Sequence, residues 1–245
     1  MSNADSIRLE EVVDIRRSSS KFKPPSRIQT NMLARGERAL LDRLCRSMPG
    51  WVTPDFLTAV GVIGVTISAL GYAASNWRPG FLFVASLGLL INWFGDSLDG
   101  SLARYRKIER PRYGYFLDHS IDGISNLILA LGLGLSPYVR MDVALFALVG
   151  YYLLSMYVFL SNYVSGEFRL TFLNAGPTEL RLVAILFNLL IYVEGPFDVR
   201  FLGATVSFYT LLVGLEGAIF IAIALYSVYG TARDLRRRRD EGSAN

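Results

Sequence analysis

Four aspartates carry the chemistry that this sequence can perform: Asp96, Asp99, Asp118 and Asp122. They stand where two strongly apolar stretches meet a basic connection. Four carboxylates placed together repel one another, so such a cluster persists only when cations neutralise it. Surroundings rich in oxygen ligands and poor in histidine select Mg²⁺, Mn²⁺ or Ca²⁺. The sequence therefore predicts a divalent-metal site of an enzyme rather than a membrane anchor.

The spacing of the aspartates predicts how helices present them. Residues three or four positions apart share one face of an α-helix, so Asp96 and Asp99 point the same way. The same holds for Asp118 and Asp122 on the following helix. Because the connection between the two pairs is short, we expect the two helices to be antiparallel neighbours. The four carboxylates should then converge on one volume.

Small residues and one arginine accompany the aspartates. Gly100 and Ala103 follow the first pair, and Gly114 lies one helical turn before the second pair. Small side chains at these positions leave room for a bulky ligand, or they permit tight helix packing. Arg104 supplies a permanent cation with planar donors that suit a phosphate. Together these features indicate a nucleotide diphosphate as the ligand.

This segment resembles the signature of the CDP-alcohol phosphotransferase family, which reads Asp-x-x-Asp-Gly-x-x-Ala-Arg and then Gly-x-x-x-Asp-x-x-x-Asp. All eight fixed positions match, at Asp96, Asp99, Gly100, Ala103, Arg104, Gly114, Asp118 and Asp122. The spacer at 105–113 is one residue longer than is usual in the family, which affects the shape of the connection more than the metal site.

The resemblance implies a transfer reaction at a two-metal site. In this family the four aspartates hold two divalent cations, here Mg²⁺ or Mn²⁺, which bridge the pyrophosphate of a CDP-linked donor. The nucleotide contacts of the family fall at Asp96, Gly100, Ala103, Arg104 and Gly114. Asp122 is then the base that takes a proton from the hydroxyl of an alcohol or lipid acceptor, and CMP leaves. The resemblance also implies a homodimer.

His119 is the single histidine of the chain and lies beside Asp118. A lone histidine is usually structural, but imidazole titrates near neutrality and could act as a second candidate base. An Asp-His pair at this place resembles the choline/ethanolamine phosphotransferase branch, whose members use CDP-choline or CDP-ethanolamine with diacylglycerol. The compact length instead resembles enzymes that use CDP-diacylglycerol and a small polar alcohol. We favour the second reading and keep the first as the alternative.

Apolar stretches predict an all-α integral membrane protein. The chain is 52% hydrophobic and 19% charged, and its apolar residues are gathered into blocks. A helix needs about 20 apolar residues to cross the hydrocarbon core of a bilayer. We predict six transmembrane helices, at roughly 56–75, 80–95, 115–137, 142–165, 179–193 and 206–229. An amphipathic interfacial helix is expected to precede them.

The charge distribution predicts the orientation of the chain in the membrane. Of the 25 Lys and Arg residues, 22 fall in segments that would share one side, and the other side has only Arg78, Arg140 and Arg200. The positive-inside rule therefore places both termini and the aspartates on the cytoplasmic side. We expect a multi-pass protein of a cell membrane, such as the bacterial inner membrane.

The other segments flank a six-helix catalytic domain that we place at 51–232. Residues 1–26 are predicted to be a mobile polar arm. Residues 27–50 form an amphipathic basic helix that lies on an anionic membrane surface or packs on the bundle. Residues 233–245 form a basic cytoplasmic tail. A charge run beside a span usually has a topological role, so we do not expect nucleic-acid binding.

Three charged residues outside the signature have two interpretations each. Glu179 and Arg181, at the start of the fifth span, could contact substrate phosphates or form a structural interfacial pair. Glu216, in the middle of the sixth span, is either functional or paired. A transporter is the non-enzyme alternative, but it would distribute acids along a pore. A catalytically inactive scaffold would have lost a metal ligand, and all four remain.

Overall fold

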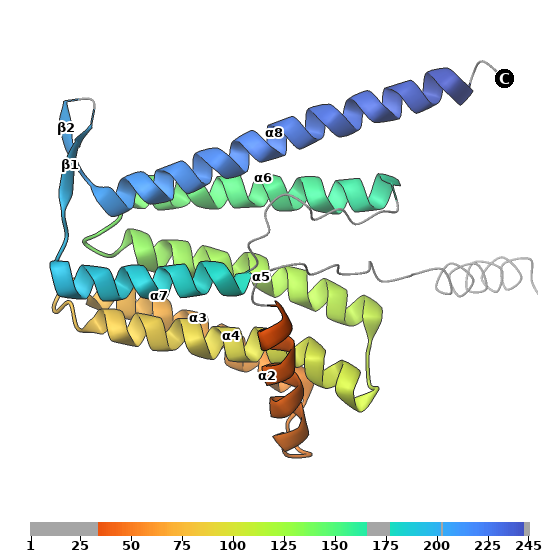
Figure 1. Ribbon diagram of the computed structural model, residues 1–245, viewed down its shortest axis with the longest axis horizontal. Helices are drawn as coiled ribbons and strands as arrows, with labels where there is room; N and C mark the ends of the chain where they lie inside the picture. The colour runs from red at the N-terminus through yellow and green to blue at the C-terminus, as the bar shows by residue number, and fades with distance from the viewer. Residues whose placement is uncertain (1–33, 166–176, 202, 243–245) are drawn as a thin grey trace, which may run out of the picture.

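The computed structural model describes residues 34–165, 177–201 and 203–242, and most of them lie in long helices (Figure 1). The helices are α2 (Ala34–Ser47), α3 (Pro54–Ala74), α4 (Phe81–Arg106), α5 (Pro111–Gly134), α6 (Met141–Ser165), α7 (Pro177–Glu194) and α8 (Phe208–Gly242). The expectation of an essentially all-helical architecture is confirmed. The polar arm predicted at 1–26 lies outside the described residues.

Four of these helices are long and apolar enough to cross a membrane: α3, α4, α6 and the part of α8 from Phe208 to Arg237. The helices α5 and α7 coincide with the predicted third and fifth spans but are not among these four. Asp118 and Asp122 lie in α5, and Glu179 and Arg181 lie in the first turns of α7. The structure thus supports a membrane protein with four clear spans, and six spans remain a prediction.

Helices α3 and α4 form the closest pair of the bundle because glycines line their contact. A Cβ atom on Gly88 would lie 2.3 Å from the backbone nitrogen of Ser68, and one on Gly95 would lie 2.3 Å from that of Gly61. The side-chain amide of Asn92 donates a 3.0 Å hydrogen bond to the carbonyl oxygen of Gly61. Small residues that bring two backbones together are typical of helix pairs in membranes.

The arrangement of α5 differs from the sequence-based expectation. Helix α5 is antiparallel to α4, but it packs against α3 and α6, whereas α4 packs against α3, α7 and α2. Helices α4 and α5 therefore run antiparallel as expected, but each packs mainly against other helices. Helix α5 also approaches α3 closely, since a Cβ atom on Gly132 would lie 2.3 Å from Cα of Ala69. The aspartate side chains bridge the remaining distance between α4 and α5.

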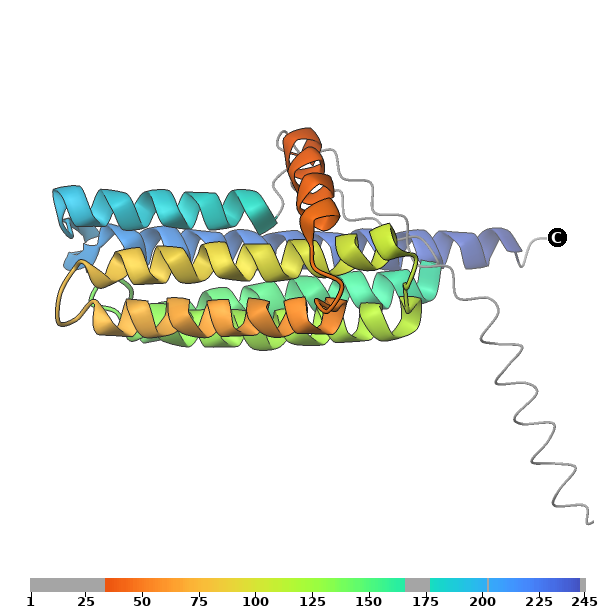
Figure 2. The same ribbon diagram turned by 90° about the horizontal axis from the view of Figure 1, so that it is seen from below.

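Helix α2 lies crosswise to the bundle helices, as Figures 1 and 2 show from two directions. Its buried Leu41 and Cys45 pack in one cluster with Leu57 of α3 and Leu98 of α4. Helix α2 thus packs across the start of α3 and the C-terminal half of α4. Part of the predicted helix, residues 27–33, lies outside the described residues.

Interactions at the end of α4 fix the neighbouring connections. The guanidinium of Arg106 donates hydrogen bonds to the carbonyl oxygens of Pro49 at 2.8 Å and Met48 at 3.2 Å, in the connection between α2 and α3. Lys107 then ends the helix in a left-handed conformation with φ of 57°. Such a residue is a common way to terminate a helix.

A short β-hairpin at the opposite end of the bundle was not predicted. Strands β1 (Asp198–Phe201) and β2 (Ala204–Ser207) pair antiparallel, with Gly203 at a positive φ of 82° in the turn. The predicted sixth span at 206–229 overlaps β2, but α8 begins only at Phe208. The ring of Phe208 stacks on Phe197 with a centroid distance of 4.7 Å, which anchors the base of the hairpin.

Candidate active site

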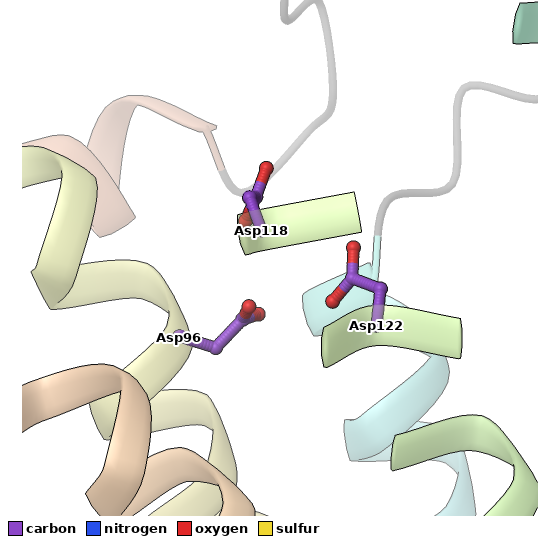
Figure 3. Close-up of side chains that lie close together, drawn as sticks. All are labelled: Asp96, Asp118 and Asp122. Atoms are coloured by element: carbon purple, nitrogen blue, oxygen red, sulfur yellow. The ribbon is translucent and has the colours of Figure 1, made fainter. Parts of the chain in front are cut away.

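The structure brings three of the four predicted aspartates together, across the C-terminal half of α4 and the N-terminal half of α5. Carboxylate oxygens of Asp96, Asp118 and Asp122 all lie within 4.8 Å of one another. Figure 3 shows the three side chains turned toward a common centre. All three residues are half-buried. The helical spacing of the signature thus has the predicted geometric consequence, although α4 and α5 pack mainly against other helices.

Asp99 lies beside this group but makes different contacts. The hydroxyl of Thr58 in α3 donates a 2.7 Å hydrogen bond to Oδ2 of Asp99. Its other oxygen, Oδ1, accepts a hydrogen bond from the backbone nitrogen of Gly100. Among the described residues, the metal-compatible group comprises the other three aspartates. The role of Asp99 as a metal ligand therefore stays a prediction.

The residues of the group fit a divalent cation. Three carboxylates within one ion's reach offer the hard oxygen ligands that Mg²⁺ and Mn²⁺ prefer. Three half-buried negative charges at this separation also repel one another, so a cation that neutralises them would be favoured. Asp96, Asp118 and Asp122 are the residues that would hold it.

Arg181 reaches the group from α7. Its Nη2 atom lies 2.8 Å from Oδ2 of Asp96, and the two side chains are only 17% and 26% exposed. Sequence reasoning left Arg181 open between a phosphate contact and an interfacial pair. The ion pair that the structure shows is with Asp96, 85 residues away in the chain. No local pattern in the sequence signals a partner at that separation.

Two further side chains near the group were not predicted. Thr58 lies in the first turns of α3, and no spacing rule connects it to Asp99. Tyr151 of α6 lies near enough to the aspartate group to experience the charge of Asp122 and, to a smaller extent, of Asp96. The apolar helix around Tyr151 resembles an ordinary span, so its proximity to the acids could not be read from the sequence.

The predicted nucleotide-binding residues lie toward the end of α4 and the start of α5. Arg104 is exposed, and its Nη2 atom donates a 3.2 Å hydrogen bond to the hydroxyl of Ser101. A Cβ atom on Gly100 would lie 3.2 Å from Nη1 of Arg104, so this glycine leaves room for the guanidinium. Ala103 is half-buried, and a Cβ atom on Gly114 would meet nothing within 4 Å.

His119 sits at the edge of the group. Its Nδ1 atom lies 2.8 Å from the carbonyl oxygen of Tyr115 and 3.6 Å from Oδ2 of Asp118. A carbonyl oxygen only accepts hydrogen bonds, so Nδ1 carries a proton, and Nε2 of the neutral ring is an acceptor. The ring packs against Tyr115 and Phe159, with centroid distances of 4.2 Å and 5.2 Å.

The ring of His119 also lines a groove with a volume of about 400 Å³. Most of the other lining residues of the groove are aromatic, namely Tyr115, Phe116, Phe159 and Tyr163. Ser120 and Asn162 complete the lining. The groove thus lies against α5 and α6, beside the aspartate group. Its lining suits a ligand with a largely apolar body.

Comparison with known protein families identifies the family to which the chain belongs. The family model described as CDP-alcohol phosphatidyltransferase matches residues 51–215, which include the whole aspartate segment. The chain belongs to this family. The CDP-alcohol phosphatidyltransferase match also covers α3 to α7 and the start of α8, so it includes Thr58, Tyr151 and Arg181.

Individual relatives support the family assignment. The chain is 28% identical over 236 residues to Cholinephosphotransferase 1 of Danio rerio, a match that covers 91% of this chain and 56% of that protein. It is 32% identical over 104 residues to Archaetidylinositol phosphate synthase of Pyrococcus horikoshii, covering 42% of this chain and 52% of that protein.

A third relative is Phosphatidylinositol phosphate synthase of Cutibacterium acnes, which is 34% identical over 85 residues, or 34% of this chain and 38% of that protein. The chain spans about half the length of the curated relatives it matches. The family model thus establishes the family of this chain, and the donor and acceptor of the chain itself are left to be proposed.

Proposed function

We propose that this protein is an integral-membrane enzyme of phospholipid synthesis. It transfers a substituted phosphoryl group from a CDP-linked donor to the hydroxyl of an acceptor and releases CMP. The observation that carries this proposal is the convergence of Asp96, Asp118 and Asp122, which come from the two halves of the family's signature. Membership of the CDP-alcohol phosphatidyltransferase family supports the same reaction class.

The aspartates have two roles in the proposed reaction, metal binding and proton abstraction. Asp96, Asp118 and Asp122, together with Asp99, would hold two divalent cations, Mg²⁺ or Mn²⁺. Bound cations of this kind neutralise charge that develops on phosphate oxygens during transfer. Asp122 accepts the proton of the acceptor hydroxyl. His119 is the alternative base, because Nδ1 is engaged with the carbonyl oxygen of Tyr115 and Nε2 is the ring nitrogen that would take that proton.

The remaining signature residues bind the nucleotide. Arg104 is exposed and carries planar donors that suit the diphosphate of the donor. Gly100 and Gly114 keep side-chain atoms away from the space beside Arg104 and at the start of α5. Ala103 presents a small side chain on the same segment of α4. These residues position the donor so that its distal phosphorus faces the acceptor hydroxyl.

Two donor classes are candidates. The first is CDP-diacylglycerol with a small polar alcohol, in line with relatives named as synthases of inositol phosphate lipids. The second is CDP-choline or CDP-ethanolamine with diacylglycerol. A specific observation favours this second candidate: the match to Cholinephosphotransferase 1 covers 91% of the chain. The aromatic groove beside His119 would hold the apolar body of the lipid substrate in either case.

The placement of the enzyme in the cell follows from the same features. We propose a location in a cell membrane with both termini and the active site on the cytoplasmic side. Support comes from the charge asymmetry and from the four helices that can span a membrane. We also propose that residues 51–232 form the catalytic domain between a juxtamembrane helix and a basic tail, and that the enzyme is a homodimer.

The experiment that tests this function measures CMP release by the purified protein in lipid nanodiscs. Each donor is offered with its acceptor, with and without Mg²⁺ or Mn²⁺. We expect metal-dependent release from one donor class only. Asp122→Asn should lower the turnover about 10²- to 10⁴-fold if Asp122 is the base. Turnover that persists at the same rate in chelator would overturn the mechanism.

Asp142→Asn is the matched control for this experiment. Asp142 pairs with Arg140 at the opposite end of the bundle, and the side chains of both are largely exposed. The control loses one carboxylate without touching the aspartate group, so its turnover should equal that of the wild type. Full activity of Asp122→Asn would assign the proton transfer to another residue, and His119→Gln would then be the variant to compare.

A further inference from the structure

The side chain of Arg181 pairs with Asp96, which is also one of the predicted metal-binding residues. Oδ2 of Asp96 lies 2.8 Å from Nη2 of Arg181, and the same residue belongs to the group with Asp118 and Asp122. Arg181 comes from α7, outside the signature that defines the family. Its position on the fifth residue of α7 puts it at the end of the bundle where α4 ends and α5 begins.

A guanidinium and a divalent cation that bind the same carboxylate of Asp96 each weaken the binding of the other. Both are positive and would repel each other at the separation set by one shared carboxylate. The repulsion is not well screened, because the Arg181 and Asp96 side chains are only 17% and 26% exposed. Without substrate, the arginine thus stabilises the acidic group itself and lowers its affinity for cations.

We propose that Arg181 is a positioning residue that competes with divalent cations for Asp96 and turns to the diphosphate when the donor binds. This inference rests on the proposed function of the site. The diphosphate offers the arginine a new anionic partner with a geometry that suits its planar fork. Release of Asp96 then raises the affinity for the cations. Donor and cation binding are coupled, and the coupling is reciprocal.

The surroundings of Arg181 allow this exchange without movement of α7. Thr178, three residues earlier, is tied to Glu37 of α2 by a 2.7 Å hydrogen bond, so the start of the helix is anchored. The long arginine side chain can change its partner by rotating about its own bonds. The exchange requires a side-chain rotation rather than a helix displacement.

The test measures Mn²⁺ binding by electron paramagnetic resonance in nanodiscs, for the wild type and for Arg181→Gln, without substrate. Glutamine removes the competing charge, so Arg181→Gln should bind Mn²⁺ about tenfold more tightly than the wild type. Addition of CDP, corrected with a protein-free sample, should tighten Mn²⁺ binding in the wild type more than in Arg181→Gln. This readout does not depend on turnover.

Two variants serve as controls. Arg140→Gln removes an arginine that pairs with Asp142 at the other end of the bundle, and its Mn²⁺ affinity should match the wild type. Arg181→Lys keeps the positive charge and should retain weak Mn²⁺ binding, although it lacks the planar fork. The thermal unfolding of each variant is compared first, which separates a change in the site from a loss of folding.

The results distinguish failure of this inference from failure of the proposed function. Equal or weaker Mn²⁺ binding by folded Arg181→Gln, alongside normal binding by the wild type, would overturn the competition and make Arg181 a structural support. A folded wild-type protein that binds no Mn²⁺ would overturn the metal site and the competition together. An equal response to CDP in both proteins would overturn the coupling.

Discussion

Thr178 near the start of α7 donates a 2.7 Å hydrogen bond to Oε1 of Glu37 in α2, although 141 residues separate them. The indole nitrogen of Trp93 in α4 donates a 2.9 Å hydrogen bond to the same oxygen. One carboxylate oxygen thus joins the crosswise helix to two bundle helices. Arg181 lies one turn beyond Thr178 and pairs with Asp96. The position of α2 therefore influences where α7 holds Arg181 relative to the aspartate group.

Replacing Glu37 tests this link. Glu37→Ala removes the acceptor of two hydrogen bonds, so we expect a loss of about 1–3 kcal/mol in stability. Glu37→Gln keeps an oxygen at the same place and should lose less. Thermal unfolding in nanodiscs measures the difference. Asp42→Ala on the same helix is the control, because Asp42 is exposed, and an equal loss in this control would contradict the link.

Local sequence patterns predicted much of the site. The three- and four-residue spacings in α4 and α5 placed the aspartates on single helix faces, and a helix does this whatever its neighbours are. Asp96, Asp118 and Asp122 therefore converge as expected. The apolar runs located α3, α4 and α6 for a similar reason, because a span requires a minimum length of apolar residues.

Contacts between distant parts of the chain could not be predicted in the same way. The position of α5 depends on how closely α3 approaches α4, which the glycines along both helices decide. The partners of Thr58 and Arg181 follow from that packing rather than from their spacing. The hairpin at 198–207 has strands of four residues each, which are too short to show a periodic pattern.

Gly95 offers a test of the contact between α3 and α4. A Cβ atom at this position would lie 2.3 Å from the backbone nitrogen of Gly61, so Gly95→Ala must push the two helices apart. Overpacking of this kind costs about 1–3 kcal/mol. Because Gly95 directly precedes Asp96, we also expect reduced Mn²⁺ binding. Thermal unfolding and Mn²⁺ titration of one preparation measure both effects.

Gly230 provides the matched control for this substitution. It lies within α8, and a Cβ atom there would meet nothing within 4 Å. Gly230→Ala should leave Mn²⁺ binding unchanged and raise the stability by up to about 1 kcal/mol, because alanine favours helix more than glycine does. If Gly95→Ala behaved like Gly230→Ala, the close approach of α3 and α4 would be refuted.

Replacing Gly114 tests whether this glycine is needed for ligand binding rather than for folding. A Cβ atom on this exposed residue would meet nothing within 4 Å, so Gly114→Ala should not lower the melting temperature. If the glycine leaves space for the nucleotide, the added methyl group should raise the donor KM about tenfold. Steady-state kinetics of CMP release test this. An unchanged KM would remove Gly114 from the nucleotide site.

Cys45 allows the docking of α2 to be followed through a single thiol. The residue is 2% exposed. Burial raises the pKa of the Cys45 thiol, Asp42 raises it further, and Arg104 and Arg106 lower it. The thiolate is the reactive form, so a raised pKa together with burial should make alkylation by N-ethylmaleimide slow at pH 8. Mass spectrometry measures the rate against that of protein unfolded in detergent.

The same thiol gives a pH dependence of stability with a definite sign. Because the pKa of Cys45 is higher in the folded state than in the unfolded state, the folded protein holds the proton more tightly. Its contribution to stability is present below the ordinary thiol pKa and is lost as the pH rises through the raised value. Cys45→Ala should flatten this part of the stability profile. A profile above pH 8 that is identical in both proteins would contradict the raised pKa of Cys45.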